Sequence, residues 1–159
     1  MTAQARGHSL EHRIPPPVVG VLLAVGMWWL ARMFPGPSFP LGLRIALATV
    51  LALGGLAFLI PATRAFLGAR TTVNPLKPEA ATTLVVAGAY RFTRNPMYVG
   101  FALLLLAWAA WLAAAIAVLG PVLFVAYLTR FQILPEERAL RARFGDAFDA
   151  YCRRVRRWL

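Results

Sequence analysis

Between Arg94 and Arg130 the chain reads NPMYVGFALLLLAWAAWLAAAIAVLGPVLFVAYLT, a run of 35 residues without a charged side chain. A helix needs about 20 apolar residues to cross the hydrocarbon core of a bilayer, so this run is too long for one span and slightly short for two. A tight helical hairpin with a turn near residues 111–115 resolves the mismatch, if Arg130 reaches back to the interface. Gly120-Pro121 is the other candidate break, but a turn there leaves the last span too short, so we interpret it as a kink or a first-turn feature.

The composition is that of a membrane protein. Of the 159 residues, 60% are hydrophobic and 14% are charged, whereas a soluble domain averages about 45–50% apolar and 25% charged residues. The basic residues flank the apolar runs, so the net charge of +11 fits anionic lipid headgroups better than nucleic acid. We therefore predict an all-α, polytopic membrane protein with one domain over residues 1–159. The predicted elements are four spans at about 17–34, 41–62, 97–112 and 114–134, a cytoplasmic loop at 63–96 and a cytoplasmic amphipathic C-terminal helix at 135–158.

The two upstream runs carry less information. Arg6 and Arg13 precede the first run, as they would in a signal peptide, but no small-x-small cleavage site follows it. We therefore favour an anchor that is retained. In the second run, Gly54-Gly55 predicts either a close helix contact or plain backbone flexibility.

Residues 135–158 predict a helix with one apolar face. Pro135 suits the first turn, and Gly145-Asp146 weakens the middle. Apolar side chains recur at helical spacing, at Leu140, Phe144, Phe148, Tyr151, Val155 and Trp158. Seven arginines crowd the remaining faces, so we expect the helix to lie on anionic lipid and to cover a site formed by the loop and the hairpin.

Polar residues gather at both ends of the hairpin. Before it, residues 88–100 read GAYRFTRNPMYVG, and after it residues 134–137 read LPEE. Ionisable and polar groups beside hydrocarbon are costly and usually functional. We interpret the two segments together as one site at the membrane surface.

The first segment has the pattern Gly88-x-Tyr90-x-x-x-Arg94-Asn95-Pro96-x-Tyr98-x-Gly100, and the second has the pattern Glu136-Glu137-x-x-Leu140-x-x-x-Phe144-Gly145. Together they resemble the isoprenylcysteine carboxyl methyltransferase family and its phospholipid N-methyltransferase relatives. The resemblance covers residues 71–158. It implies an integral membrane methyltransferase of the bacterial inner membrane that uses S-adenosyl-L-methionine. The implied partners are membrane lipids and a hydrophobic acceptor, either an isoprenylcysteine carboxylate or a lipid.

The resemblance also implies roles for individual residues. Those implied to hold the cofactor are Thr82, Thr83, Leu84, Val85, Tyr90, Asn95, Pro96, Met97, Tyr98 and Glu136. Those implied in catalysis are Arg94, Glu136 and Glu137. In the eukaryotic enzymes an arginine handles the substrate, and by spacing this position falls on Gln132, with Arg130 two residues out of register. Gln132 and Arg130 are therefore the candidate substrate residues. The lack of an arginine at the matching position argues against a prenylcysteine carboxylate as the substrate.

The chemistry of the implied cofactor fits these residue types. Glu136 and Glu137 are acceptors for its ammonium group, and Arg94 is a donor for its carboxylate. Tyr90 and Tyr98 supply aromatic walls for adenine and for the sulfonium. No Gly-rich strand-turn-helix signature is present, which excludes a Rossmann methyltransferase. Methyl transfer needs no metal, and one cysteine with two isolated histidines predicts no metal site.

Each motif also has an ordinary explanation. Glu136 and Glu137 suit a helix first turn, Arg94 suits a span flank, and Asn95-Pro96 suits a helix cap. Only their joint occurrence favours a site. A small four-span transporter stays open, although no acidic residue lies within the predicted spans. A non-catalytic lipid-binding protein of the same fold stays open too, as does a nicotinamide-dependent reductase by fold analogy.

Lysine and arginine counts predict the orientation. With four spans, 15 of these residues lie on the side of both termini and two, Arg32 and Arg44, lie on the other. The positive-inside rule then places both termini and the loop in the cytoplasm. Reporter fusions after residues 37, 75 and 159 are expected to report outside, inside and inside. An outside signal at residue 159 would contradict this topology.

Overall fold

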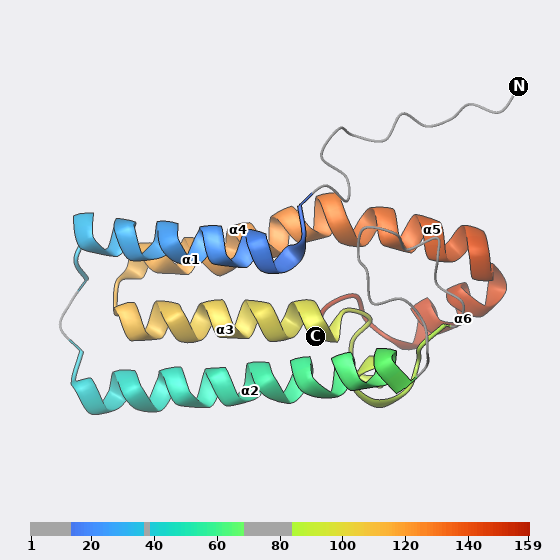
Figure 1. Ribbon diagram of the computed structural model, residues 1–159, viewed down its shortest axis with the longest axis horizontal. Helices are drawn as coiled ribbons and strands as arrows, with labels where there is room; N and C mark the ends of the chain where they lie inside the picture. The colour runs from blue at the N-terminus through green and yellow to red at the C-terminus, as the bar shows by residue number, and fades with distance from the viewer. Residues whose placement is uncertain (1–13, 37–38, 69–83) are drawn as a thin grey trace, which may run out of the picture.

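The computed structural model describes residues 14–36, 39–68 and 84–159, and within these ranges the chain forms helices and no strand. Four antiparallel helical rods lie side by side, with α3 between α2 and the pair α1 and α4 (Figure 1). The first three rods are α1 (Pro16–Met33), α2 (Leu41–Gly68) and α3 (Pro96–Leu112). The fourth rod is continuous through η3 (Ala115–Val118), α4 (Leu119–Leu128), the π-helix η4 (Thr129–Ile133) and α5 (Leu134–Phe144). Two short helices complete the described chain, η2 (Gly88–Arg91) before α3 and α6 (Asp146–Arg154) after α5.

The described helices are those of an integral membrane protein. Three segments are long and apolar enough to cross a membrane, namely Pro16–Met33, Leu41–Ala65 and Ala115–Phe144. α3 is the shorter apolar helix, with 17 residues that rise about 26 Å. The all-α membrane class is therefore confirmed, while the count of four spans stays a prediction.

The hairpin is built as the sequence predicts. α1 and α3 match the predicted spans 17–34 and 97–112 to within one residue. The turn falls at Ala113, whose φ of 52° is in the left-handed region. Gly120 and Pro121 lie in the first turn of α4, where proline is tolerated.

Two helices continue beyond the ends of the predicted spans. α2 does not end at residue 62 but continues through Pro61 to Gly68. The last rod does not end at residue 134, because a π-turn, closed by a bond from the Leu134 N–H to the Thr129 carbonyl, carries the helix past Pro135 to Phe144. Glu136 and Glu137 consequently lie within a helix of spanning length. The expectation that no acidic residue lies within a span stays a prediction, because the helix is longer than the roughly 20 residues that a span needs.

The single helix predicted at 135–158 is wrong. α5 ends at Gly145, whose φ of 49° and ψ of −126° turn the chain, and α6 then folds back beneath α5 (Figure 1). Beyond Arg154 the backbone is extended. Phe148 and Tyr151, at 2% and 4% exposure, are consequently buried in the protein and not laid on lipid.

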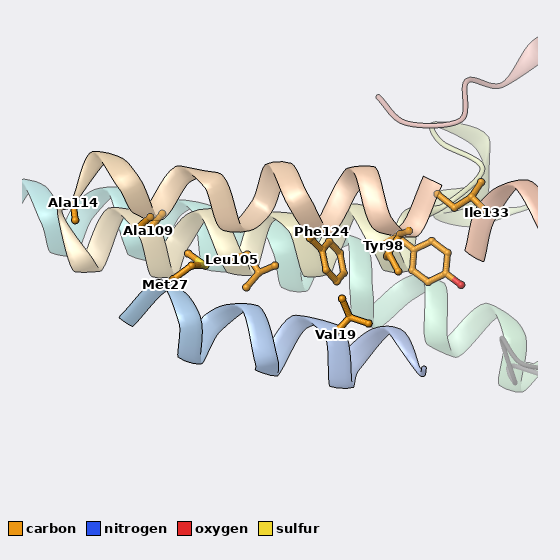
Figure 2. Packing of buried hydrophobic residues seen from close by; sticks show 10 residues of the cluster. Val19, Met27, Tyr98, Leu105, Ala109, Ala114, Phe124 and Ile133 are labelled. Atoms are coloured by element: carbon orange, nitrogen blue, oxygen red, sulfur yellow. The ribbon is translucent and has the colours of Figure 1, made fainter. Parts of the chain in front are cut away.

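The helices pack closely at small residues. A Cβ on Gly55 of α2 would lie 2.9 Å from the Gly100 carbonyl oxygen of α3, and a Cβ on Gly100 would lie 2.8 Å from the Gly55 carbonyl oxygen. The two backbones therefore touch, which confirms the first of the two outcomes predicted for Gly54-Gly55. On the other side of α3, apolar side chains fill the space toward α1 and α4 in one long row that ends at Tyr98 and Ile133 (Figure 2).

At the end of the bundle that carries the hairpin turn, arginine side chains satisfy local groups. Arg44 donates from Nε, at 3.0 Å, and from its terminal nitrogen to the Trp111 carbonyl, one of the last carbonyls of α3. Arg32 of α1 lies 4.7 Å above the Trp28 ring. Most of the remaining described arginines lie toward the opposite end, as the charge count predicts.

Replacing Gly100 with alanine is expected to push α2 and α3 apart and lower the free energy of unfolding by about 1–3 kcal/mol. Reversible unfolding in mixed micelles with increasing dodecyl sulfate measures this. Gly26→Ala is the matched control, because nothing lies within 4 Å of a Cβ at that position. Equal stability of the two variants would contradict the backbone contact.

Candidate active site

The two motif segments meet at one end of the bundle. η2 and the start of α3 bring the first segment, and η4 with the start of α5 bring the second. α6 and the chain after it close the same end (Figure 1). The turn at Ala113 sends the fourth rod back along α3, so segments more than 30 positions apart in sequence become neighbours.

Glu136 is the centre of one polar cluster. The Tyr98 hydroxyl donates to its Oε1 at 2.7 Å, and the Gln132 side-chain amide donates to the same oxygen at 2.8 Å. Gln132 and Glu136 are four residues apart along the rod and so share a face, while Tyr98 comes from the first turn of α3. Gln132 is 2% exposed and Tyr98 is 9% exposed. The side chain of Glu136 is thus held by two donors, one of which, Tyr98, lies at the end of the apolar row (Figure 2).

Tyr90 lies beside this cluster. Its ring is buried, and its carbonyl accepts a bond of 2.8 Å from the Tyr151 hydroxyl of α6. Burial first, then Tyr151 and the Glu136 carboxylate, raise the pKa of the Tyr90 phenol above its ordinary value. The phenol is neutral at physiological pH, as an ordinary tyrosine is.

Glu137 is the centre of a second, ionic cluster. Arg157 forms a two-pronged pair with it, from Nε to Oε1 at 2.9 Å and from Nη2 to Oε2 at 2.7 Å. Arg94 reaches the same carboxylate only through Nη2, 3.3 Å from Oε1. The Nε of Arg94 is buried and has no hydrogen-bond partner within the part of the chain that the structure describes. Two guanidinium groups therefore surround one carboxylate, and one of them keeps an unused donor.

Residues 155–159, which we name the return segment, tie the clusters together. The Arg156 carbonyl accepts from the Arg94 N–H at 2.8 Å. The Arg157 carbonyl accepts from the Thr93 hydroxyl at 3.1 Å and from the Asn95 side-chain amide at 2.9 Å. The Trp158 indole donates to the Thr129 hydroxyl at 3.2 Å. The return segment therefore bonds to the loop before α3, to α5 and to the π-helix.

Sequence reasoning missed this segment. It assigned Val155 and Trp158 to a helix face and the neighbouring arginines to lipid. The available signal was Gly145, because a glycine that turns the chain permits everything after it to fold back. Thr93 and Tyr151, both buried hydrogen-bond donors, were missed for the same reason.

The structure brings six of the predicted residues together. Arg94, Tyr98, Gln132, Glu136 and Glu137 form the two clusters, with Tyr90 alongside. The side chain of Asn95 makes no helix cap and binds the return segment instead, while Pro96 begins α3. Thr82 and Thr83 lie outside the described residues.

Three predicted residues lie to the sides of the clusters. Val85 and Met97 pack around Ala62 of α2, together with Tyr90. Arg130 extends along the Phe131 ring, 5.5 Å from its centroid.

One ordinary explanation for Glu136 and Glu137 fails on this geometry. Acids in a first turn are stabilised by the unpaired N–H groups of a helix start. α5 continues directly from η4, so its first turn is inside a longer helix. Both carboxylates instead accept from side chains of other elements.

An apolar groove runs along the outside of α1 and the fourth rod. Its volume is about 380 Å³, and its lining residues are Val19, Leu23, Leu123, Ala126, Tyr127 and Phe131. Phe131 is next to Gln132, the buried amide of the Glu136 cluster. None of the residues of the two clusters lines the groove, whose nearest lining residue in sequence is Phe131.

Metal chemistry finds no support in the described part of the chain, which holds no group of three or more His, Cys, Asp or Glu able to bind a metal ion. The one cysteine, Cys152, is half-buried on α6.

Comparison with known proteins agrees with the site. The family model for phospholipid methyltransferases matches residues 43–147, more than half of the chain. The chain belongs to the phospholipid methyltransferase family. The matched range holds both motif segments, and membership, together with the apolar helices, identifies a membrane methyltransferase. The return segment and α1 of this phospholipid methyltransferase family member lie outside the match.

Two further comparisons complete the picture. An uncharacterized protein of Haemophilus influenzae is 44% identical over 63 residues, which make up 100% of that protein and 40% of this chain. No solved structure matches the chain.

Proposed function

We propose that this membrane methyltransferase uses S-adenosylmethionine and methylates a lipid-like acceptor at the cytoplasmic face of a bacterial inner membrane. The observation that carries the proposal is the pairing of the Glu136 cluster with the ionic Glu137 cluster at one end of an apolar bundle. Polar groups of this kind are costly beside hydrocarbon unless they serve a ligand or each other, and here one donor remains unused.

The residues present fit the cofactor. Its amino acid part carries an ammonium group, for which the Glu136 carboxylate is the acceptor, and a carboxylate, for which Arg94 is the donor. Tyr90 and Val85 offer an aromatic and an apolar surface to its adenine. When bound, the cofactor supplies an electrophilic methyl group.

The protein contributes by orienting the groups that hold the cofactor and by excluding water from the acceptor atom. Tyr98 and Gln132 fix the Glu136 carboxylate before any ligand arrives, so little ordering is left to do on binding. Tyr90 offers a neutral aromatic wall, and burial raises its pKa further from physiological pH. The buried surroundings of both clusters keep water from the acceptor atom, which strengthens nucleophilic attack in line with the leaving sulfur.

The apolar groove is the route that fits a lipid acceptor. A hydrocarbon chain in it would place its headgroup at Phe131, beside Gln132. Gln132 is an amide and Glu136 a carboxylate, and both favour an amine or a neutral headgroup over a second carboxylate. We therefore place a lipid amine ahead of an isoprenylcysteine carboxylate.

Calorimetry in nanodiscs is expected to show binding of S-adenosylmethionine and of S-adenosylhomocysteine. Glu136→Ala should raise both dissociation constants about ten- to hundredfold, because a charge-assisted contact is worth roughly 1.5–3 kcal/mol. Asp146→Ala, at an exposed acid of α6, is the matched control and should change neither. No binding to the wild type up to millimolar ligand would refute the enzyme.

Chain length tests the acceptor route. With lysophosphatidylethanolamines from hexanoyl to palmitoyl, transfer of labelled methyl should rise with the length of the chain until the groove is filled. Ala126→Trp, which narrows the groove, should remove this dependence, whereas Ala57→Trp on the exposed face of α2 should not. Equal methylation of short and long acceptors by the wild type would refute the route.

A further inference from the structure

We propose that Arg157 is a positioning residue of the site, which occupies Glu137 so that Arg94 stays available to an anionic group of the bound ligand. The proposal rests on the proposed function, since that anionic group is the carboxylate of the cofactor. It adds a residue outside both motif segments and outside the range matched by the family.

The Glu137 carboxylate is shared unequally. Arg157 takes both of its oxygens, at 2.9 and 2.7 Å, whereas Arg94 contacts only one, at 3.3 Å. The parallel fork is the stronger form of the guanidinium–carboxylate pair, because it makes two charge-assisted bonds in one plane. Glu137 therefore belongs chiefly to Arg157.

Arg94 is left partly unsatisfied by this arrangement. Its Nε is buried and donates to no group in residues 14–36, 39–68 and 84–159. Buried donors are nearly always paired, and an unpaired one costs free energy. An acceptor brought by a ligand satisfies it, and a carboxylate is the acceptor that a guanidinium prefers.

The backbone fixes the two arginines relative to one another. The Arg157 carbonyl holds Thr93 and Asn95, the neighbours of Arg94 on either side. The Arg156 carbonyl holds the N–H of Arg94 itself. These bonds join the return segment to the loop before α3, so the two arginines approach Glu137 from backbones that are bonded to one another.

Loss of the Arg157 side chain transfers the Glu137 carboxylate from Arg157 to Arg94. A buried carboxylate without its partner is strongly disfavoured, so Glu137 would take Arg94 as its only cation. The local charge falls from one net positive charge to none. A ligand carboxylate would then meet a neutral pair, while the contact of a ligand ammonium with Glu136 would be unaffected.

Two ligands separate these effects by calorimetry in nanodiscs. S-adenosylhomocysteine carries both the ammonium and the carboxylate, and its decarboxylated form keeps only the ammonium. Arg157→Gln should weaken binding of S-adenosylhomocysteine about tenfold or more and leave the decarboxylated form within about twofold of wild type. Arg153→Gln is the matched control, because its side chain is exposed on α6, and it should change neither.

A second variant tests the cause. Adding Glu137→Gln to Arg157→Gln removes the carboxylate that captures Arg94, so binding of S-adenosylhomocysteine should recover relative to Arg157→Gln alone. Arg157→Lys, which keeps the charge without the fork, should give an intermediate loss that is again confined to S-adenosylhomocysteine. If Arg157→Gln does not fold, the Arg157→Lys variant is used for the test in its place.

Wild-type affinity in Arg157→Gln, or equal losses for both ligands, would overturn the positioning role and leave the proposed function standing. Failure of the double variant to recover would overturn it as well. If the wild type binds neither ligand, the proposed function falls and the positioning role falls with it.

Discussion

The hydrogen bond from the Tyr98 hydroxyl to the Glu136 carboxylate is the constraint on which the site depends. It joins the first turn of α3 to the start of α5, and so fixes the two arms of the hairpin relative to one another. Little else along these arms is polar, because the contacts between them are made by small and apolar residues. A carboxylate at this position is tolerated only with donors, and Tyr98 and Gln132 supply them. A register shift of the arms would break the Tyr98 bond and leave Glu136 with Gln132, four residues away on its own rod, as its donor.

The ionic cluster around Glu137 is built differently from the Glu136 cluster. Glu137, Arg94 and Arg157 come from three separate segments, and the return segment holds them by backbone bonds as well as by charge. The cluster is asymmetric, since Arg157 contacts both carboxylate oxygens while the Nε of Arg94 has no partner among the described residues. Under the proposed function, this asymmetry leaves Arg94 available to a ligand.

The sequence predicts the helices of this protein well, but it does not predict how the chain beyond Gly145 folds back onto the site. The charge-free run before Arg130 dictates a hairpin with a turn near Ala113, since neither one helix nor two full spans fits its length. The motif spacing predicts that Tyr98 and Glu136 share a site, because that spacing is specific only when both halves are present. Helical periodicity fails beyond Gly145, where an apolar face of period 3.6 suits a helix on lipid and a segment folded into the protein equally well. The partners of Glu137 depend on contacts between distant segments, which no local pattern encodes.

The central claim is that both motif segments bind one cofactor, and photochemical labelling tests it most directly. Ultraviolet irradiation of the protein in nanodiscs with methyl-labelled S-adenosylmethionine attaches label to the residues nearest the ligand, and peptide sequencing locates it. The account predicts label in residues 84–98 and 129–137, competed away by S-adenosylhomocysteine. Competable label confined to α1 or to the end that carries Arg44 and Trp111 would contradict it.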